Sequence, residues 1–139
     1  MIFRYELPAI EQAADWLLSS IGSAKVICFH GAMGAGKTTL IQAICQRIGI
    51  TGSFSSPTFP IINEYGLSSG AGSLYHLDLY RLSSAAEAER AGVVEALYSG
   101  LLCFVEWPER VPGILPPDAV HVYLELNDTE SRSLRVSNK

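Results

Sequence analysis

The residues of this sequence best suited to chemistry lie in one glycine-rich segment, Gly31-Ala-Met-Gly-Ala-Gly-Lys-Thr38. The segment matches the pattern G-x-x-x-x-G-K-[S/T] at every fixed position. Glycines at these places let successive backbone N–H groups point into one concavity, where they can hold phosphate oxygens. Lys37 adds a positive charge for the outer phosphates, and the Thr38 hydroxyl is a ligand for Mg²⁺. The segment predicts a nucleoside-triphosphate site, with these candidate binding residues: Gly31, Ala32, Met33, Gly34, Ala35, Gly36, Lys37, Thr38 and Thr39.

A phosphate-binding loop needs acidic partners for Mg²⁺ and for an attacking water. Glu106 follows the apolar run Leu101-Leu-Cys-Phe-Val105, which is the layout of a Walker B acid with Glu in place of Asp. Asp78 lies in a segment with alternating polar and apolar residues, and is the second candidate. Glu106 and Asp78 are the candidate catalytic and metal-binding acids, and they could exchange the roles of metal ligand and water-positioning group. The alternative interpretation is a solvated carboxylate at a strand end for Glu106 and an exposed charge on a half-buried strand for Asp78.

A third candidate catalytic residue is Thr58, in the segment Ser55-Ser-Pro-Thr-Phe59. At this distance from the glycine-rich loop, many NTPases place a switch segment that contacts the γ-phosphate or Mg²⁺. Trp107, next to Glu106, could gate the site or simply pack in the core. The three histidines lack metal-ligand spacing. The sequence has no N-K-x-D motif, which leaves guanine selectivity unsupported and makes ATP the expected nucleotide.

Alternating and continuous apolar patterns indicate the elements that must position these residues. We expect a buried strand at 25–30 directly before the loop and a helix at 37–48 directly after it, ended by Gly49. The other expected strands are 2–6, 60–65, 73–80, 101–105, 120–126 and 133–136, and the other helices begin near Pro8, Ser84 and Val93. We expect residues 111–117 to form a proline-rich loop. Strands of both patterns, mixed with helices, predict an α/β fold with a mixed sheet.

Length and composition limit the remaining possibilities. The chain has 139 residues, 48% of them hydrophobic, which predicts one domain over residues 1–139 rather than a disordered chain. The net charge is −4 and the sequence contains no Lys/Arg cluster, so we expect no direct binding of nucleic acid. No apolar run approaches the roughly 20 residues that a membrane helix needs. Three cysteines without paired spacing and the lack of a signal-peptide layout favour a cytoplasmic protein.

Four blocks, taken in order along the chain, resemble the bacterial TsaE family. They are the glycine-rich loop at 31–39, Ser56-Pro-Thr-Phe59, Tyr75-His-Leu-Asp-Leu-Tyr-Arg-Leu82 and Val105-Glu-Trp-Pro-Glu-Arg110. The resemblance implies a P-loop NTPase-like three-layer fold, with a mixed parallel and antiparallel sheet flanked by helices. It also implies ATP and Mg²⁺ as cofactors. Thr38 and Glu106 would hold the metal, Asp78 would be a second essential acid, and Thr58 would lie in the switch segment.

The same resemblance places two more residues near the nucleotide and suggests partners. Arg132 matches a basic residue that the family has near its C-terminal end, and Glu11 matches a position bordering the adenine. The family is the ATPase component of the machinery that makes threonylcarbamoyladenosine at position 37 of tRNA. It acts through a TsaB–TsaD heterodimer, in which TsaD performs the transfer, so this chain would meet tRNA only indirectly.

Two alternative functions remain open at this stage. One is a small-molecule or nucleoside kinase, although the isolated arginines and the short chain leave little room for a lid over the phosphates. The other is a non-catalytic switch that binds ATP and recruits partners.

Overall fold

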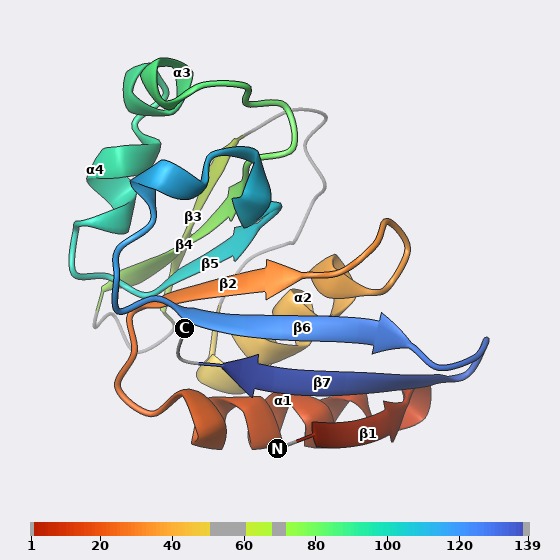
Figure 1. The fold of residues 1–139 in the computed structure, drawn as a ribbon. Coiled ribbons are helices and arrows are strands. Elements are labelled where there is room, and N and C mark those ends of the chain that lie inside the picture. The colour runs from red at the N-terminus through yellow and green to blue at the C-terminus, as the bar shows by residue number, and fades with distance from the viewer. Residues whose placement is uncertain (1, 51–60, 68–71, 138–139) are drawn as a thin grey trace.

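The computed structural model describes residues 2–50, 61–67 and 72–137. Within them one seven-stranded sheet runs through the molecule, in the order β1-β7-β6-β2-β5-β4-β3 (Figure 1). The strands are β1 (Ile2–Glu6), β2 (Val26–His30), β3 (Ile62–Gly66), β4 (Ser73–Asp78), β5 (Cys103–Glu106), β6 (Val120–Leu126) and β7 (Ser131–Ser137).

Helices cover both faces of this sheet, which gives the three layers expected. They are α1 (Ile10–Ile21), α2 (Lys37–Ile48), α3 (Ala85–Arg90) and α4 (Val93–Leu97). Three short 3-10 turns add η1 (Leu7–Ala9), η2 (Pro108–Arg110) and η3 (Pro112–Ile114). Helices α1 and α2 share one apolar cluster with the sheet, whereas α3 and α4 share another. None of the described helices is long and apolar enough to cross a bilayer.

The mixed sheet has a parallel centre and antiparallel edges. Strand β2 pairs in parallel with β5 and β6, and β4 pairs in parallel with β5. Antiparallel hairpins close the two sides, through β3 with β4 and through β6 with β7 and then β1. In parallel strands the carboxyl ends meet at one edge of the sheet, which is where α/β proteins bind ligands. The ends of β2, β4 and β5 carry His30, Asp78 and Glu106 to that edge.

Successive residues of the central strands face opposite layers, as their continuous apolar pattern requires. Ile27 and Phe29 of β2 belong to the core shared with α1 and α2, whereas Val26 and Cys28 belong to the core shared with α3 and α4. The ring of Phe29 meets that of Phe104 from β5 edge to face, with centroids 5.9 Å apart. This contact joins the strand before the glycine-rich loop to the strand that carries Glu106.

Most expected elements are present, with small shifts at their ends. The helix at 37–48 matches exactly, and Gly49 ends it with φ 101° while its N–H donates to Cys45 and Gln46 carbonyls. The strand expected at 101–105 instead spans Cys103–Glu106, because the Leu101 N–H donates to the Ser99 hydroxyl in a turn. The expected proline-rich loop at 111–117 contains the 3-10 turn η3.

Replacing Phe104 with alanine tests how much this core packing stabilises the fold. Phe104 is fully buried, so Phe104→Ala should lower the free energy of unfolding by about 3–5 kcal/mol. Urea unfolding followed by circular dichroism measures this loss. The matched control is Tyr98→Ala, because Tyr98 is 60% exposed and its removal should change stability by no more than about 0.5 kcal/mol. Equal effects of the two substitutions would contradict the packing described here.

Candidate nucleotide site

The glycine-rich segment forms a tight loop between β2 and α2. Gly34 and Gly36 have φ values of 83° and 98°, in the left-handed region that favours glycine. Gly31 is needed for a different reason, since a Cβ there would lie 2.8 Å from the Leu124 carbonyl oxygen. The loop leads directly into α2, whose first residue is Lys37. The N-terminus of a helix of this length attracts anions through its free N–H groups and its dipole.

Lys37 is buried under an aromatic ring at the start of this helix. Its side chain is 5% exposed, its ammonium donates to the Gly31 carbonyl at 2.6 Å, and Nζ lies 3.4 Å from the centroid of the Trp107 ring. Neither partner carries a net charge. Burial lowers the pKa of Lys37 from its usual value, whereas the carboxylates of Glu106, Glu109 and Asp78 act to raise it. No ion pair of Lys37 with an acidic side chain is formed within the described residues, so its ammonium can contact an anion that enters here.

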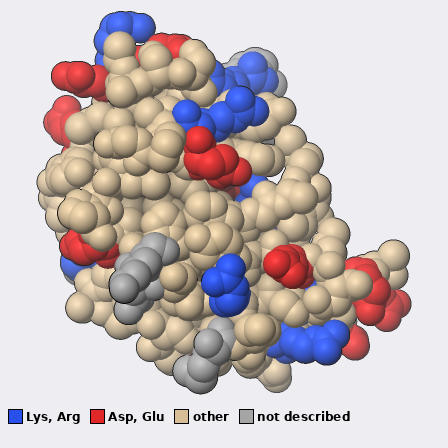
Figure 2. All heavy atoms as spheres, viewed as in Figure 1, with Lys and Arg blue, Asp and Glu red and all other residues tan. Residues whose placement is uncertain are grey.

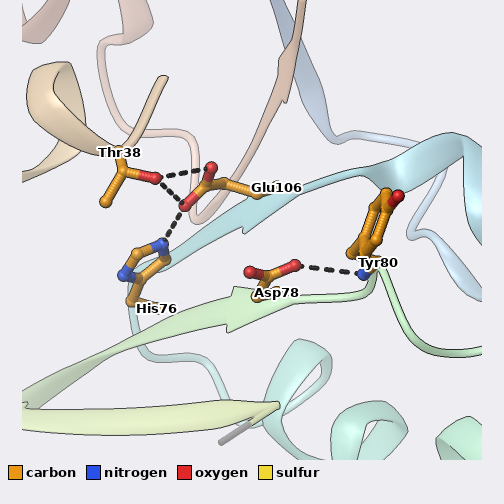
Figure 3. Close-up of polar contacts among 5 residues, drawn as sticks. All are labelled: Thr38, His76, Asp78, Tyr80 and Glu106. Atoms are coloured by element: carbon orange, nitrogen blue, oxygen red, sulfur yellow. Dashed lines mark hydrogen bonds and ion pairs between the residues drawn. The ribbon is translucent and has the colours of Figure 1, made fainter. Parts of the chain in front are cut away.

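Glu106 is buried at the end of β5, with an exposed fraction of 4%. The Thr38 hydroxyl lies 2.9 Å from its Oε1 and 3.0 Å from its Oε2, and donates to the carboxylate. The His76 Nε2 lies 2.7 Å from Oε2 (Figure 3). The sequence motif thus places the hydroxyl of the phosphate-binding loop and the Walker B-like acid in direct contact.

Asp78 lies at the same level as Glu106 on the neighbouring strand, because the two residues are register partners of β4 and β5. Its Oδ1 accepts a hydrogen bond from the Tyr80 backbone N–H at 3.0 Å (Figure 3). Among the described residues there is no group of three or more His, Cys, Asp or Glu that could hold a metal ion alone. Mg²⁺ does not need one, since it is commonly held by one or two carboxylates together with phosphates and water.

These groups open into a cavity of about 570 Å³, within the range of small-molecule sites. It is lined by Tyr5, Leu7, Ile10, Met33, Gly34, Gly36, Lys37, Thr38, Thr39, Ile61, Asp78, Tyr80, Arg81, Glu106, Trp107 and Arg132. The loop, both predicted acids and Arg132 therefore converge on one space, although they are far apart in the sequence.

Two buried polar atoms of this lining lack a partner within the described residues. They are the Tyr5 hydroxyl and Nη1 of Arg132. Tyr5 and Arg132 are register partners of β1 and β7, and Nε of Arg132 donates to the Ala35 carbonyl of the loop at 3.3 Å. Burying polar atoms without a partner is costly, so such atoms at a cavity can form hydrogen bonds with a polar ligand or a water molecule there. With the loop, Lys37 and the Thr38–Glu106 pair, they fit a Mg²⁺-bound nucleotide.

Some predicted residues lie elsewhere. Glu11 is exposed in the first turn of α1 and is not among the lining residues, whereas the preceding residue, Ile10, is. Gly31, Ala32 and Ala35 form the loop without lining the cavity. Thr58 lies outside the described residues, and its role stays a prediction.

The sequence did not reveal several lining residues. Tyr5, Leu7 and Ile10 reach the cavity through strand pairing and helix packing that no local motif encodes.

Trp107 is, among the described residues, the one non-glycine residue with positive φ, at 58°. That conformation is unfavourable for a bulky residue and is kept where the surrounding structure requires it. Here it places the indole over Lys37 and beside Tyr80, with centroids 5.0 Å apart.

A family model described as "Threonylcarbamoyl adenosine biosynthesis protein TsaE" matches residues 6–134. The chain belongs to the TsaE family. It is 36% identical over 105 residues to the TsaE protein of Haemophilus influenzae, covering 76% of this chain and 65% of that protein. It is 40% identical over 117 residues to the TsaE protein of Synechocystis, covering 81% of this chain and 72% of that protein. A crystal structure of YdiB from Bacillus subtilis has a TM-score of 0.70 and 25% identity, and covers 100% of this chain and 86% of that one.

This TsaE chain also has a pair of histidines beside the loop. Nε2 of His30, the last residue before Gly31, lies 2.7 Å from Nδ1 of His121, so one ring donates and the other accepts. The His30 ring stacks on Tyr123 with centroids 4.5 Å apart. Burial and the neighbouring His121 lower the pKa of His30, while Glu109 acts in the opposite direction, and burial lowers the pKa of His121.

These pKa shifts predict that the protein becomes less stable in mild acid. Below the usual histidine pKa of about 6.5 the unfolded chain takes up protons that the folded pair resists, so the free energy of unfolding falls as pH falls. His121→Asn removes one of the two titrating rings and should make this fall shallower. Urea unfolding over a series from about pH 7.5 to 5.5 measures the slope for both proteins. A variant slope as steep as that of the parent protein would show that the pair does not contribute.

Proposed function

We propose that this chain is a Mg²⁺-dependent ATPase that serves threonylcarbamoyladenosine biosynthesis on tRNA. The observation that carries the proposal is the hydrogen bond of Thr38 to Glu106. It lies beside a complete phosphate-binding motif, in a chain of the TsaE family. The relatives from Haemophilus influenzae and Synechocystis are named tRNA threonylcarbamoyladenosine biosynthesis proteins. The pathway proposed for this chain rests on that naming, whereas the proposed ATPase activity rests on the chemistry of its own site.

The positions of the residues support the following proposed roles. The backbone N–H groups of the loop and the N-terminus of α2 bind the phosphates, and Lys37 neutralises the outer ones. Thr38 and Glu106 hold Mg²⁺, which supplies charge neutralisation at the phosphates when bound. Asp78, at the same level of the sheet, either orients the attacking water or shares the metal. Arg132 lies against the loop and offers its unpartnered Nη1 to the nucleotide.

Residues outside this centre complete the nucleotide assignment. Apolar side chains of Leu7 and Ile10 line the part of the cavity contributed by the N-terminal segment, where we place the base. Glu11 follows Ile10 in the first turn of α1 and is exposed outside the lining. Thr58 is the proposed switch residue, reporting the γ-phosphate. ATP is the proposed nucleotide because the chain lacks the guanine-specific N-K-x-D motif.

The chain is proposed to act through a TsaB–TsaD type heterodimer and to meet tRNA only within that complex. Lys and Arg side chains are interspersed with Asp and Glu on the face shown in Figure 2, consistent with the net charge of −4. Among the described residues of this face, the charges do not form the extended basic patch that direct tRNA binding would need. The three cysteines are all buried and unbridged, which suits the reducing cytoplasm.

Phosphate release from ATP tests this function. The purified chain should hydrolyse ATP slowly in the presence of Mg²⁺ and faster when a TsaB–TsaD heterodimer is added. Glu106→Gln keeps the shape of the side chain but removes its charge, and should reduce the rate by roughly 100-fold or more. Glu95→Gln is the matched control, because Glu95 is exposed on α4 and lies outside the cavity.

Other outcomes would favour the alternatives. Phosphoryl transfer to a nucleoside would indicate a kinase, and ATP binding without hydrolysis even with the heterodimer would indicate a switch. Full activity of Glu106→Gln would show that the acid has been assigned wrongly.

A further inference from the structure

His76 occupies an unusual place for a polar residue. It lies on β4 between Leu74 and Asp78, with its side chain on the same face of the strand as theirs. Leu74 is 1% exposed and belongs to the core shared with α1 and α2, and His76 itself is 9% exposed. If packing were the only requirement, an apolar residue would suit this buried position. A buried imidazole is costly unless it is hydrogen-bonded, and the partner that it has is Glu106.

The hydrogen bonds to Glu106 are unequal for its two oxygens. Thr38 has one hydroxyl proton, which it shares between Oε1 at 2.9 Å and Oε2 at 3.0 Å. Oε2 has a second donor in His76 Nε2, at 2.7 Å. Because an ionised carboxylate only accepts, Nε2 carries the proton of this hydrogen bond. Oε1 therefore keeps more of its lone-pair capacity, and Oε2 is the anchored oxygen.

This arrangement matches the way proteins orient acidic metal ligands. A ligating carboxylate is held by hydrogen bonds from neighbouring groups, which fix its rotation and its charge. Thr38 cannot do this alone, because its oxygen would itself face the metal in the proposed site. His76 approaches from the neighbouring strand, whose next outward residue on the same face is Asp78.

We propose that His76 is a positioning residue: its Nε2–H anchors Oε2 of Glu106 and so presents Oε1 for the Mg²⁺ that accompanies the nucleotide. The inference rests on the proposed function, since it concerns how this chain prepares Glu106 for a metal-bound nucleotide. It adds to that function a residue that touches neither phosphate nor metal.

Removal and replacement of the donor test the proposal. His76→Leu fills the space without a donor, whereas the amide nitrogen of His76→Gln can stand near the original Nε2. Isothermal titration calorimetry with ADP, with Mg²⁺ and then with EDTA, measures how much Mg²⁺ strengthens binding in each protein. His76→Leu should lose on the order of tenfold or more of the Mg²⁺-dependent affinity while binding ADP in EDTA like the parent protein. His76→Gln should retain most of the Mg²⁺ effect.

Matched substitutions at His121 provide the control. His121 also makes a histidine hydrogen bond at 2.7 Å on the same sheet, but its partner is His30 and not an acid. His121→Leu and His121→Gln should leave the Mg²⁺ effect unchanged. Circular dichroism checks that each variant is folded. If His76→Leu does not fold, His76→Asn replaces it, because the shorter amide cannot reach Oε2 from the same backbone position.

The outcomes distinguish a wrong role for His76 from a wrong proposed function. A parent protein whose ADP affinity does not depend on Mg²⁺ would overturn both. A Mg²⁺-dependent parent protein with an equally Mg²⁺-dependent His76→Leu variant would overturn the role of His76 alone. Equal losses in His76→Leu and His76→Gln would also overturn it, since a donor would then not be what matters.

Discussion

Burial of opposite charges at one edge of the sheet is the constraint on which the rest of this structure depends. Lys37 is 5% exposed and Glu106 is 4% exposed, and either charge alone would cost several kcal/mol to remove from water. Hydrogen bonds with the surrounding polar groups offset that cost. Glu106 accepts from Thr38 and His76, and Lys37 donates to the Gly31 carbonyl beneath the Trp107 ring. Among the described residues, the buried polar or charged side chains are Lys37, His76 and Glu106, and two of them line the cavity.

The parallel centre of the sheet brings these groups to one edge. Strands β4 and β5 run parallel, so Asp78 and Glu106 end side by side, and β2 delivers the loop next to them. An antiparallel neighbour in place of β4 would send the carboxyl end of that strand to the opposite edge. Strands β2 and β5 are buried on both faces, so a slip of one residue would exchange the side chains that fill the two cores and disrupt their packing.

Sequence reasoning predicted the fold well where local chemistry decides it. The strand before the loop, the helix at 37–48 and its end at Gly49 follow from an apolar run, a motif and a left-handed glycine, all read within a few residues. The 3-10 turns around Pro108 and Pro112 and the late start of β5 were missed, because single turns leave no periodic pattern. The order of the strands depends on pairings between distant segments, and neither the local patterns nor the family resemblance specified it.

The same contrast between local patterns and long-range pairings explains which site residues could be predicted. Lys37, Thr38 and Glu106 were found because each sits in a motif whose spacing reflects its chemistry. Tyr5 was not, because it reaches the cavity only through pairing with Arg132, a residue at the far end of the chain. This pairing places a strand from the beginning of the sequence against one from its end, and their side chains then stand beside the loop. A local motif can therefore predict which residues form the glycine-rich end of such a cavity, whereas the residues that complete its wall become visible only once the edge strands are paired.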